Sequence, residues 1–403
     1  MKNRDIFILF TTRIIRMFCY GFLSIILVLY LIEAGLTENQ IGLLFTFTLA
    51  GDAFISLWLT TQADHFGRKK ILIIGALLMF GAGLVFIFTN NLIFLILAAI
   101  IGVISPSDKE IGPFLPIEQS SLTQLVPNES RTKVFAWYNL TGSFSSALGA
   151  LAGGWFAQVL QINGFTVFES YRFILIGYAL GGFLLAILFL GLSSLVEATQ
   201  EINQTKKTLG LHRSKNVVFK LSALFSLDAF AGGLIVQSFM AYWFYIKFGL
   251  DSGTLGSIFF GVNILAGISA LLAVKLAERF GLINTMVFTH IPSNILLILI
   301  PLMPTLPLAI GLLLLRFSIS QMDVPTRQSY TMAVVSADER SAASGVTNIA
   351  RSVGSSLSPV LTGLFFSIPI LFNAPFFVAG TLKIIYDLLL FREFRAVKPP
   401  EEK

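Results

Sequence analysis

Charged residues are scarce in this chain. Asp, Glu, Lys and Arg make up 12% of its 403 residues and hydrophobic residues make up 55%, whereas ordinary soluble domains carry about 25% charged residues. Apolar stretches long enough to cross a hydrocarbon core about 30 Å thick recur from the first turn to the last. The scarcity of charge therefore excludes an ordinary water-soluble protein and predicts one that crosses a lipid bilayer many times.

Cysteine and histidine are nearly absent as well. The single cysteine, Cys19, leaves no intramolecular disulfide, and His65, His212 and His290 lie on separate segments. We therefore expect no metal centre, no cofactor and no catalytic cluster, which argues against a membrane enzyme. The chain also lacks the phosphate-binding loop of an ATP-driven pump and a filter-like repeat typical of a channel.

The hydropathy pattern predicts an all-α membrane protein with twelve transmembrane helices. The expected spans are residues 5–35, 39–63, 70–89, 91–126, 132–162, 171–197, 217–248, 252–276, 284–303, 306–335, 342–370 and 374–392.

The distribution of basic residues predicts the orientation of these spans. Most Lys and Arg outside the spans fall at the two termini and in the even-numbered links, whereas Arg172 and Lys247 lie beside odd-numbered links. Short cytoplasmic loops are enriched in basic residues. We therefore expect both termini in the cytoplasm of a bacterial or archaeal cell, and we attribute the net charge of +6 to topology rather than to nucleic-acid binding.

An internal repeat divides the chain. Gly35-Leu36 recurs as Gly249-Leu250, and Pro116 with Gln119-Ser120 recurs as Pro325 with Gln328-Ser329. Two parallel repeats of six spans are typical of a large class of secondary transporters. The repeat predicts a six-helix bundle over 1–197, a cytoplasmic linker over 198–216, a second bundle over 217–392 and a cytoplasmic tail over 393–403.

The segment Asp64-His65-Phe66-Gly67-Arg68-Lys69-Lys70, after the second span, resembles the cytoplasmic signature of the major facilitator superfamily (MFS), and Glu278 with Arg279 gives a weaker echo in the second half. The resemblance covers the whole chain and implies the two-bundle MFS fold. It also implies a gating role for Asp64, Gly67, Arg68, Lys69, Glu278 and Arg279. The alternative is that the basic residues only enforce topology.

Charged residues also occur inside the predicted spans, where each costs about 2.5–3.5 kcal/mol at a helix centre. They are Arg13, Arg16, Asp52, Asp108, Lys109, Glu110, Glu118, Asp228, Arg316, Asp323, Arg327, Arg351, Lys383 and Asp387. Most lie on the first, fourth, seventh and tenth spans. The MFS resemblance implies that these four spans line a central cavity.

These residues supply the candidate site. We expect substrate to contact Arg13, Arg16, Tyr20, Tyr138, Asn139, Arg327, Asn348 and Arg351. Burial can bring a carboxyl group into the range needed for proton coupling, and the candidates are Glu118, Asp228, Asp52 and Asp323. Asp108 and Glu110 are expected at an outer gate. Lys383 and Asp387 are interpreted as a local pair outside the site.

The excess of arginine predicts a monomeric, proton-coupled carrier of a small anionic or carboxylate-bearing solute, such as a metabolite or a siderophore. A proton-driven multidrug or sugar efflux protein is the alternative, favoured by 39 phenylalanines and by Gly149 to Gly154, which partly match an antiporter pattern. A transporter-shaped receptor without flux is a third hypothesis.

Overall fold

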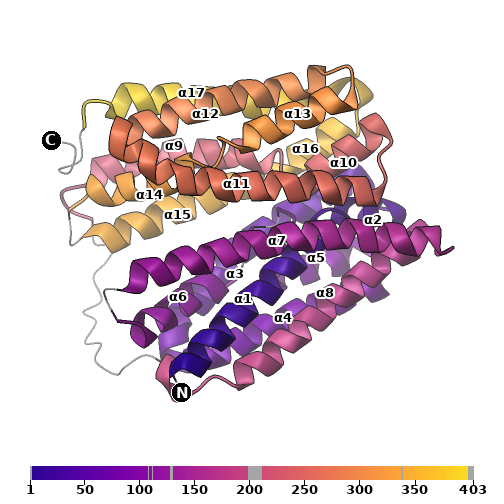
Figure 1. Ribbon diagram of the computed structural model, residues 1–403, viewed down its shortest axis with the longest axis horizontal. Helices are drawn as coiled ribbons and strands as arrows, with labels where there is room; N and C mark the ends of the chain where they lie inside the picture. The colour runs from indigo at the N-terminus through magenta and orange to yellow at the C-terminus, as the bar shows by residue number, and fades with distance from the viewer. Residues whose placement is uncertain are drawn as a thin grey trace. The chain divides into compact units, whose positions relative to one another are not determined.

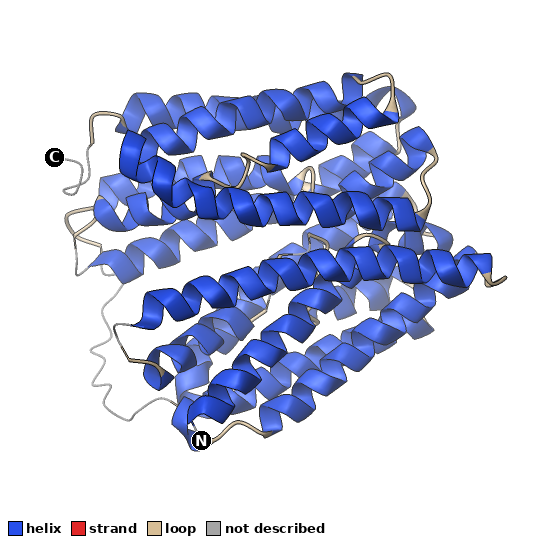
Figure 2. Ribbon diagram, in the orientation of Figure 1, coloured by secondary structure: helices blue, strands red, loops and turns tan. Residues whose placement is uncertain are grey.

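The computed structural model describes residues 2–107, 109–110, 112–127, 130–197, 211–336 and 339–397, apart from the side chains of residues 64, 65, 132 and 341. Within these ranges the chain forms helices joined by short loops and no strand (Figure 2). Parts of the predicted linker and tail, and Asp108, lie outside the described residues.

The helices follow one another along the chain with few residues between them. The α-helices of the first half are α1 (Lys2–Ser24), α2 (Leu27–Glu33), α3 (Glu38–Phe66), α4 (Arg68–Phe88), α5 (Leu92–Ile101), α6 (Phe114–Leu125), α7 (Arg131–Ile162) and α8 (Val167–Leu190). Those of the second half are α9 (Lys215–Gly233), α10 (Gln237–Phe248), α11 (Ser252–Phe280), α12 (Leu282–Leu299), α13 (Leu306–Phe317), α14 (Asp323–Ala333), α15 (Arg340–Leu357), α16 (Pro359–Phe366) and α17 (Ala374–Phe394). Short 3₁₀ turns occur at η2 (Ser194–Val196), η3 (Ile300–Leu302) and η5 (Pro369–Leu371).

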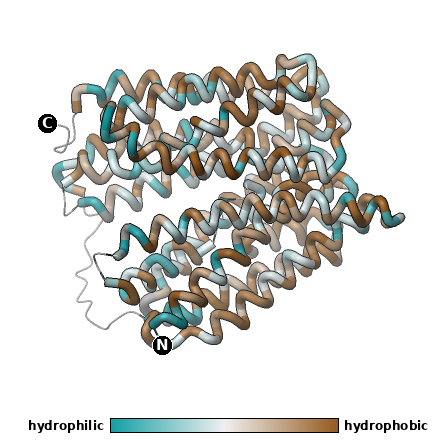
Figure 3. Tube along the Cα trace, viewed as in Figure 1, coloured by the Kyte–Doolittle hydropathy of each residue, from teal (hydrophilic) through white to brown (hydrophobic). Residues whose placement is uncertain are grey.

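Hydrophobic residues run along the helices of the chain (Figure 3). In the described part, 8 helical segments are long and apolar enough to cross a membrane. The other predicted spans correspond to α5 with α6, to α7, to α13 with α14, and to α15 with α16. The chain is thus an all-helical integral membrane protein, as the sequence predicts.

Five spans predicted as single helices are broken. The structure divides 5–35, 91–126, 217–248, 306–335 and 342–370 into two helices each. Proline accounts for breaks in the fourth, tenth and eleventh spans, because Pro113, Pro325 and Pro359 lack the N–H that an uninterrupted helix requires. Gly232 and Gly233 end α9, where glycine weakens the helix.

Contacts within the chain divide it into two compact units. Unit 1 contains Met1–Ile202 with Val236–Phe260, and unit 2 contains Asn203–Ile235 with Gly261–Lys403. Figure 1 labels α1 to α8 and α10 of unit 1, and α9 and α12 to α17 of unit 2. The segment Val236–Phe260 thus packs with the first half of the chain, although the repeat assigns it to the second.

Ser238 shows how unit 1 accommodates its broken helices. Its hydroxyl lies 2.6 Å from the Ser24 carbonyl oxygen and 2.7 Å from the Pro106 carbonyl oxygen, and its backbone N–H donates to Pro106 at 3.2 Å. These carbonyls stand where the first and fourth spans are interrupted. A broken helix inside a membrane needs such partners for its freed backbone groups.

Helix pairing repeats between the units. In unit 1, α1 packs against α7 and α4 against α8, and in unit 2, α9 packs against α15 and α12 against α17. Close approach depends on glycine: a Cβ at Gly149 would lie 2.1 Å from the Phe18 carbonyl oxygen, and one at Gly354 would lie 2.3 Å from the Ser226 carbonyl oxygen. Small residues allow such contact between membrane helices.

Candidate functional site

A cluster of ion pairs lies inside unit 1. Arg16 of α1 is fully buried, and its Nη1 and Nη2 lie 2.9 and 2.6 Å from the two carboxylate oxygens of Glu118 on α6. Its Nε donates to Glu110 at 2.7 Å. Thr12 and Tyr138 also donate to Glu118. The paired guanidinium and carboxylate groups satisfy one another in a bidentate geometry.

Arg13 belongs to the same cluster and lies three residues before Arg16 on α1. Its Nη1 pairs with Glu110 at 2.5 Å and its Nε donates to the Tyr138 carbonyl oxygen at 3.0 Å. The guanidinium carbon lies 4.5 Å from the Tyr138 ring centroid. Gly142 of α7 makes room for this arrangement, because a Cβ there would lie 2.7 Å from Arg13 Nε.

The cluster of unit 1 is balanced in charge, since Arg13 and Arg16 face Glu110 and Glu118. Sequence analysis placed Glu110 at an outer gate, but the break in the fourth span brings its carboxylate onto both arginines. Tyr20 is buried on α1. Asn139 is exposed on α7 and, among the described residues, makes no hydrogen bond to the cluster.

Asp52 of α3 supports the broken fourth span. Its Oδ1 accepts a hydrogen bond from the Gly112 backbone N–H at 2.6 Å and another from the Ser56 hydroxyl at 2.8 Å. The sequence predicts Asp52 as a candidate for proton coupling, and that role stays a prediction. The geometry gives Asp52 a structural partner at the point where Pro113 interrupts the helix.

Unit 2 contains a second cluster, centred on Asp228 of α9. Three cations from three helices reach this carboxylate: Lys383 Nζ at 2.5 Å, Arg351 Nη1 at 3.1 Å and Arg327 Nη1 at 3.3 Å. Arg327 also pairs with Asp323, four residues earlier on α14, at 2.6 Å. The cluster thus joins α9, α14, α15 and α17.

The prediction that Lys383 and Asp387 form a local pair outside the site is wrong. They are four residues apart on α17, but Lys383 pairs with Asp228. Asp387 Oδ1 instead lies 2.8 Å from His290 Nδ1, and its Oδ2 accepts from the Asn294 amide at 3.0 Å; both partners are on α12. No single-helix pattern could reveal these partners, because they lie on other helices.

Two further residues of unit 2 differ in their surroundings. Arg316, near the end of α13, is buried, and its Nε and Nη1 have no hydrogen-bond partner among the described residues. Its guanidinium carbon lies 4.6 Å from the Phe317 ring centroid. Asn348 is exposed on α15 and reaches only Ser344, at 3.5 Å.

The signature segment holds the end of α8 within unit 1. Lys69 Nζ donates to the carbonyl oxygens of Leu190 and Leu192, each at 2.8 Å. The Glu197 carboxylate accepts from the backbone N–H of Arg68 at 2.6 Å, and Gly67 has a φ of 97°. Cations at a helix C-terminus and anions at an N-terminus are both favourable.

The remaining gating candidates make fewer contacts that could bear on a gating role. Glu278 and Arg279 are exposed at the end of α11. The side chain of Asp64 lies outside the described residues. The gating roles of these residues therefore remain predictions.

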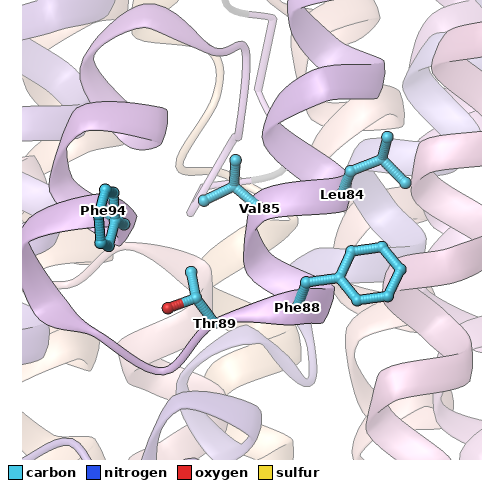
Figure 4. Close-up of a pocket in the computed structure, with 5 residues that line it drawn as sticks. All are labelled: Leu84, Val85, Phe88, Thr89 and Phe94. Atoms are coloured by element: carbon cyan, nitrogen blue, oxygen red, sulfur yellow. The ribbon is translucent and has the colours of Figure 1, made fainter.

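A surface hollow of about 340 Å³ lies at the ends of α4 and α5, where Leu84, Val85, Phe88, Thr89 and Phe94 line it (Figure 4). It contains none of the charged candidates. Within the described ranges, no group of three or more His, Cys, Asp or Glu is placed to hold a metal ion.

Two relatives extend these observations. The chain is 31% identical over 419 residues to an uncharacterised membrane protein of Saccharomyces cerevisiae, covering 96% of this chain and 93% of the relative. It is 27% identical over 157 residues to the quinolone resistance protein NorA of Staphylococcus aureus, covering 39% of each.

Solved structures share the fold across nearly the whole chain. A bacterial homologue of the human lysosomal transporter Spinster superposes with a TM-score of 0.75 at 17% identity, covering 97% of both chains. A D-xylose–proton symporter gives 0.72 at 14% identity, covering 96% of this chain and 97% of the other. A family model described as Major Facilitator Superfamily matches residues 9–359 and 247–403. The chain therefore belongs to the major facilitator superfamily and is a membrane transporter of small molecules rather than an enzyme.

Proposed function

We propose that this transporter carries a small anionic or carboxylate-bearing solute, coupled to protons, by alternating access. The observation that carries the proposal is Arg351. Its Nη1 pairs with Asp228, its side chain is 29% exposed, and its other nitrogens make no hydrogen bond to a described residue. An accessible guanidinium with free donors suits the planar geometry of a carboxylate.

The charge balance of the two clusters supports an anion at unit 2. In unit 1 each arginine is matched by a glutamate. In unit 2 the cations Arg316, Arg327, Arg351 and Lys383 outnumber the carboxylates Asp228, Asp323 and Asp387. A solute that brings a negative charge would complete this cluster.

Proton coupling is proposed through Glu118 and Asp228. Each can accept a proton only when its arginine contacts break, which an anion would promote by taking over a guanidinium group. The structurally similar D-xylose–proton symporter is, as its name states, coupled to protons. Glu118→Gln and Asp228→Asn should each reduce proton movement while counterflow of solute persists.

Proteoliposomes test the proposal directly. Lactate, succinate and citrate would serve as anionic probes, with xylose and tetraphenylphosphonium as neutral and cationic ones and an internal pH dye. We expect counterflow of at least one anion and a fall of about tenfold or more in Arg351→Gln, because a charged hydrogen bond to the solute is worth about 1.5–3 kcal/mol. Arg395→Gln removes an exposed arginine outside both clusters and should transport as wild type does.

Drug or sugar efflux is the second candidate, supported by the partial similarity to NorA. Counterflow of tetraphenylphosphonium or xylose but of no anion would favour it over the first proposal. Absence of any flux, with probe binding retained, would instead favour a receptor.

We also propose that the chain works as a monomer in a bacterial or archaeal cytoplasmic membrane, with both termini in the cytoplasm. The proposed halves are 1–197 and 217–392. The charge asymmetry of the links supports the orientation, and the sequence repeat supports the halves.

A further inference from the structure

We propose that His290 and Asp387 form a proton-binding site in unit 2, linked to Asp228 through Lys383. This inference rests on the proposed proton-coupled function and gives it a site that the sequence did not suggest. The carrying observation is a buried carboxylate whose titratable partner is an imidazole rather than a permanent cation.

The carboxylates of the two clusters differ in what holds them. Glu118 lies against Arg16, Asp323 against Arg327, and Asp228 against Lys383 and two arginines. Each would leave a buried cation unpaired if it took up a proton before an anion had replaced it, which is costly. Asp387 has no Lys or Arg within ion-pair distance in the described part of unit 2.

The contacts of Asp387 suit a group that gains and loses a proton. His290 Nδ1 lies 2.8 Å from Oδ1, and the Asn294 amide donates to Oδ2 at 3.0 Å. The side chains of Asp387 and His290 are 1% and 5% exposed. With Nδ1–H donating to the ionised carboxylate, the opposite ring nitrogen, Nε2, has no hydrogen-bond partner among the described residues and is where the proton would bind.

Proton uptake changes the charge of the pair in a defined way. A neutral imidazole with an ionised Asp387 carries one negative charge, and a proton bound at Nε2 makes the pair neutral. Histidine is the side chain whose ordinary titration lies nearest neutral pH.

Lys383 carries this change to the Asp228 cluster. It lies one helical turn from Asp387 on α17, and its Nζ is 2.5 Å from Asp228 Oδ1. Neutralising the pair leaves the cations near Asp228 more strongly in excess. Proton uptake would therefore favour an anion at Arg351, which is the sign required for proton–anion symport.

Other charged groups act on the pair from the helices packed around it. Asp228 on α9 and Lys383 and Tyr386 on α17 interact with the pair directly. Arg316 on α13, Asp323 and Arg327 on α14, and Arg351 on α15 interact with Asp228, with Tyr386 or with one another. The Tyr386 ring meets the His290 ring edge-on with centroids 6.1 Å apart. The helices α12 and α17 pack directly, so the pair is held on a rigid contact.

A titration that needs no substrate tests the site. In full-length protein labelled at histidine Cε1, His65→Gln and His212→Gln assign the three resonances. The His290 resonance is followed from pH 5.5 to about 8.5 in the wild type and in Asp387→Asn. We expect it to change with pH in the wild type and to respond differently in Asp387→Asn, where the partner carboxylate is gone. A His290 resonance that stays in one state across this range in the wild type would overturn the proposal.

Transport supplies the second arm. Glu393→Gln is the matched control, because Glu393 lies on the same helix in an exposed pair with Lys220. With acid outside, wild type and this control should accumulate the anionic probe, whereas Asp387→Asn and His290→Asn should exchange it by counterflow without accumulation. Accumulation at the wild-type level in both variants would contradict the coupling role. Absence of counterflow in the wild type would reject the anion carrier instead, and the titration would still decide the proton site.

Discussion

Arg16 is a fully buried charge of unit 1, and its environment makes a stability prediction. Glu118→Gln leaves the buried guanidinium with Glu110 as its remaining anionic contact. Removing one partner of a buried ion pair destabilises a protein by about 3–5 kcal/mol. We expect a clearly lower unfolding midpoint in detergent, measured by intrinsic fluorescence.

Glu33→Gln is the control for this change, because Glu33 is exposed at the end of α2. Its midpoint should match that of the wild type. Equal midpoints for Glu118→Gln and Glu33→Gln would show that the ion pair contributes nothing to stability.

Residues of the clusters differ in how far sequence could predict them. Arg13, Arg16 and Tyr138 stood out because charge and aromatic groups inside a span demand an explanation, and the structure brings them together. Lys383 was misread because its spacing to Asp387 suits a local pair on one helix. Its partner Asp228 lies 155 residues away, and nothing in a single sequence links the two.

Close packing of helices α1 and α7 gives a prediction at the scale of elements. A Cβ at Gly149 would lie 2.1 Å from the Phe18 carbonyl oxygen, whereas nothing lies within 4 Å of one at Gly311 on α13. Gly149→Ala should force the helices apart and cost about 1–3 kcal/mol. Gly311→Ala should be neutral or stabilising by up to about 1 kcal/mol.

Size-exclusion profiles and unfolding midpoints of the two variants measure the difference. Because both variants replace glycine by alanine in a helix, the difference between them reports on the contact between helices. Equal behaviour of the two variants would argue against a close α1–α7 contact.

The start of α9 predicts a pH dependence. The Glu339 carboxylate accepts from the backbone N–H groups of His212, Arg213 and Ser214. The Ser214 side chain, first, and then these N–H groups lower the pKa of Glu339 from its ordinary 4.5 to about 2. A carboxyl group whose pKa is lowered in the folded state stabilises that state at every pH above the group's ordinary pKa. This contribution should be complete at neutral pH and disappear as the pH falls from 4.5 towards 2.

Comparing the unfolding midpoints of wild type and Glu339→Gln from pH 7 to pH 2.5 tests this contribution. The difference should be largest at pH 7 and shrink steadily below 4.5. Glu278→Gln, an exposed change, should show no such trend. A constant difference for Glu339→Gln would mean that its carboxylate does not act through ionisation.

The positions of the helices were easier to predict than their interruptions. Hydropathy locates apolar segments well because the bilayer requires them. It does not locate breaks such as the one before Pro113 in the fourth span, which was predicted as a single helix. The first span breaks between Ser24 and Leu27 without any proline. The hydrogen bonds from Ser238 and Gln237 to Ser24 that accompany it come from a segment distant in sequence.

Across the whole molecule, the repeat and the loop charges make a prediction about orientation. Links after odd-numbered spans should face the outside, and the C-terminal end of α17 should face the cytoplasm.

Cys19 is the chain's single cysteine and is buried, so Cys19→Ala provides a background for site-directed labelling. In intact cells, a membrane-impermeant thiol reagent should label Asn163→Cys between α7 and α8. Arg395→Cys, just beyond α17 and equally exposed, should react only after the membrane is permeabilised. Labelling of Arg395→Cys in intact cells would reverse the orientation. Labelling of both positions would show that the reagent had entered the cells. The reaction would then be repeated at lower temperature. Under those conditions Asn163→Cys must react and Arg395→Cys must not, if the positive-inside rule governs this chain.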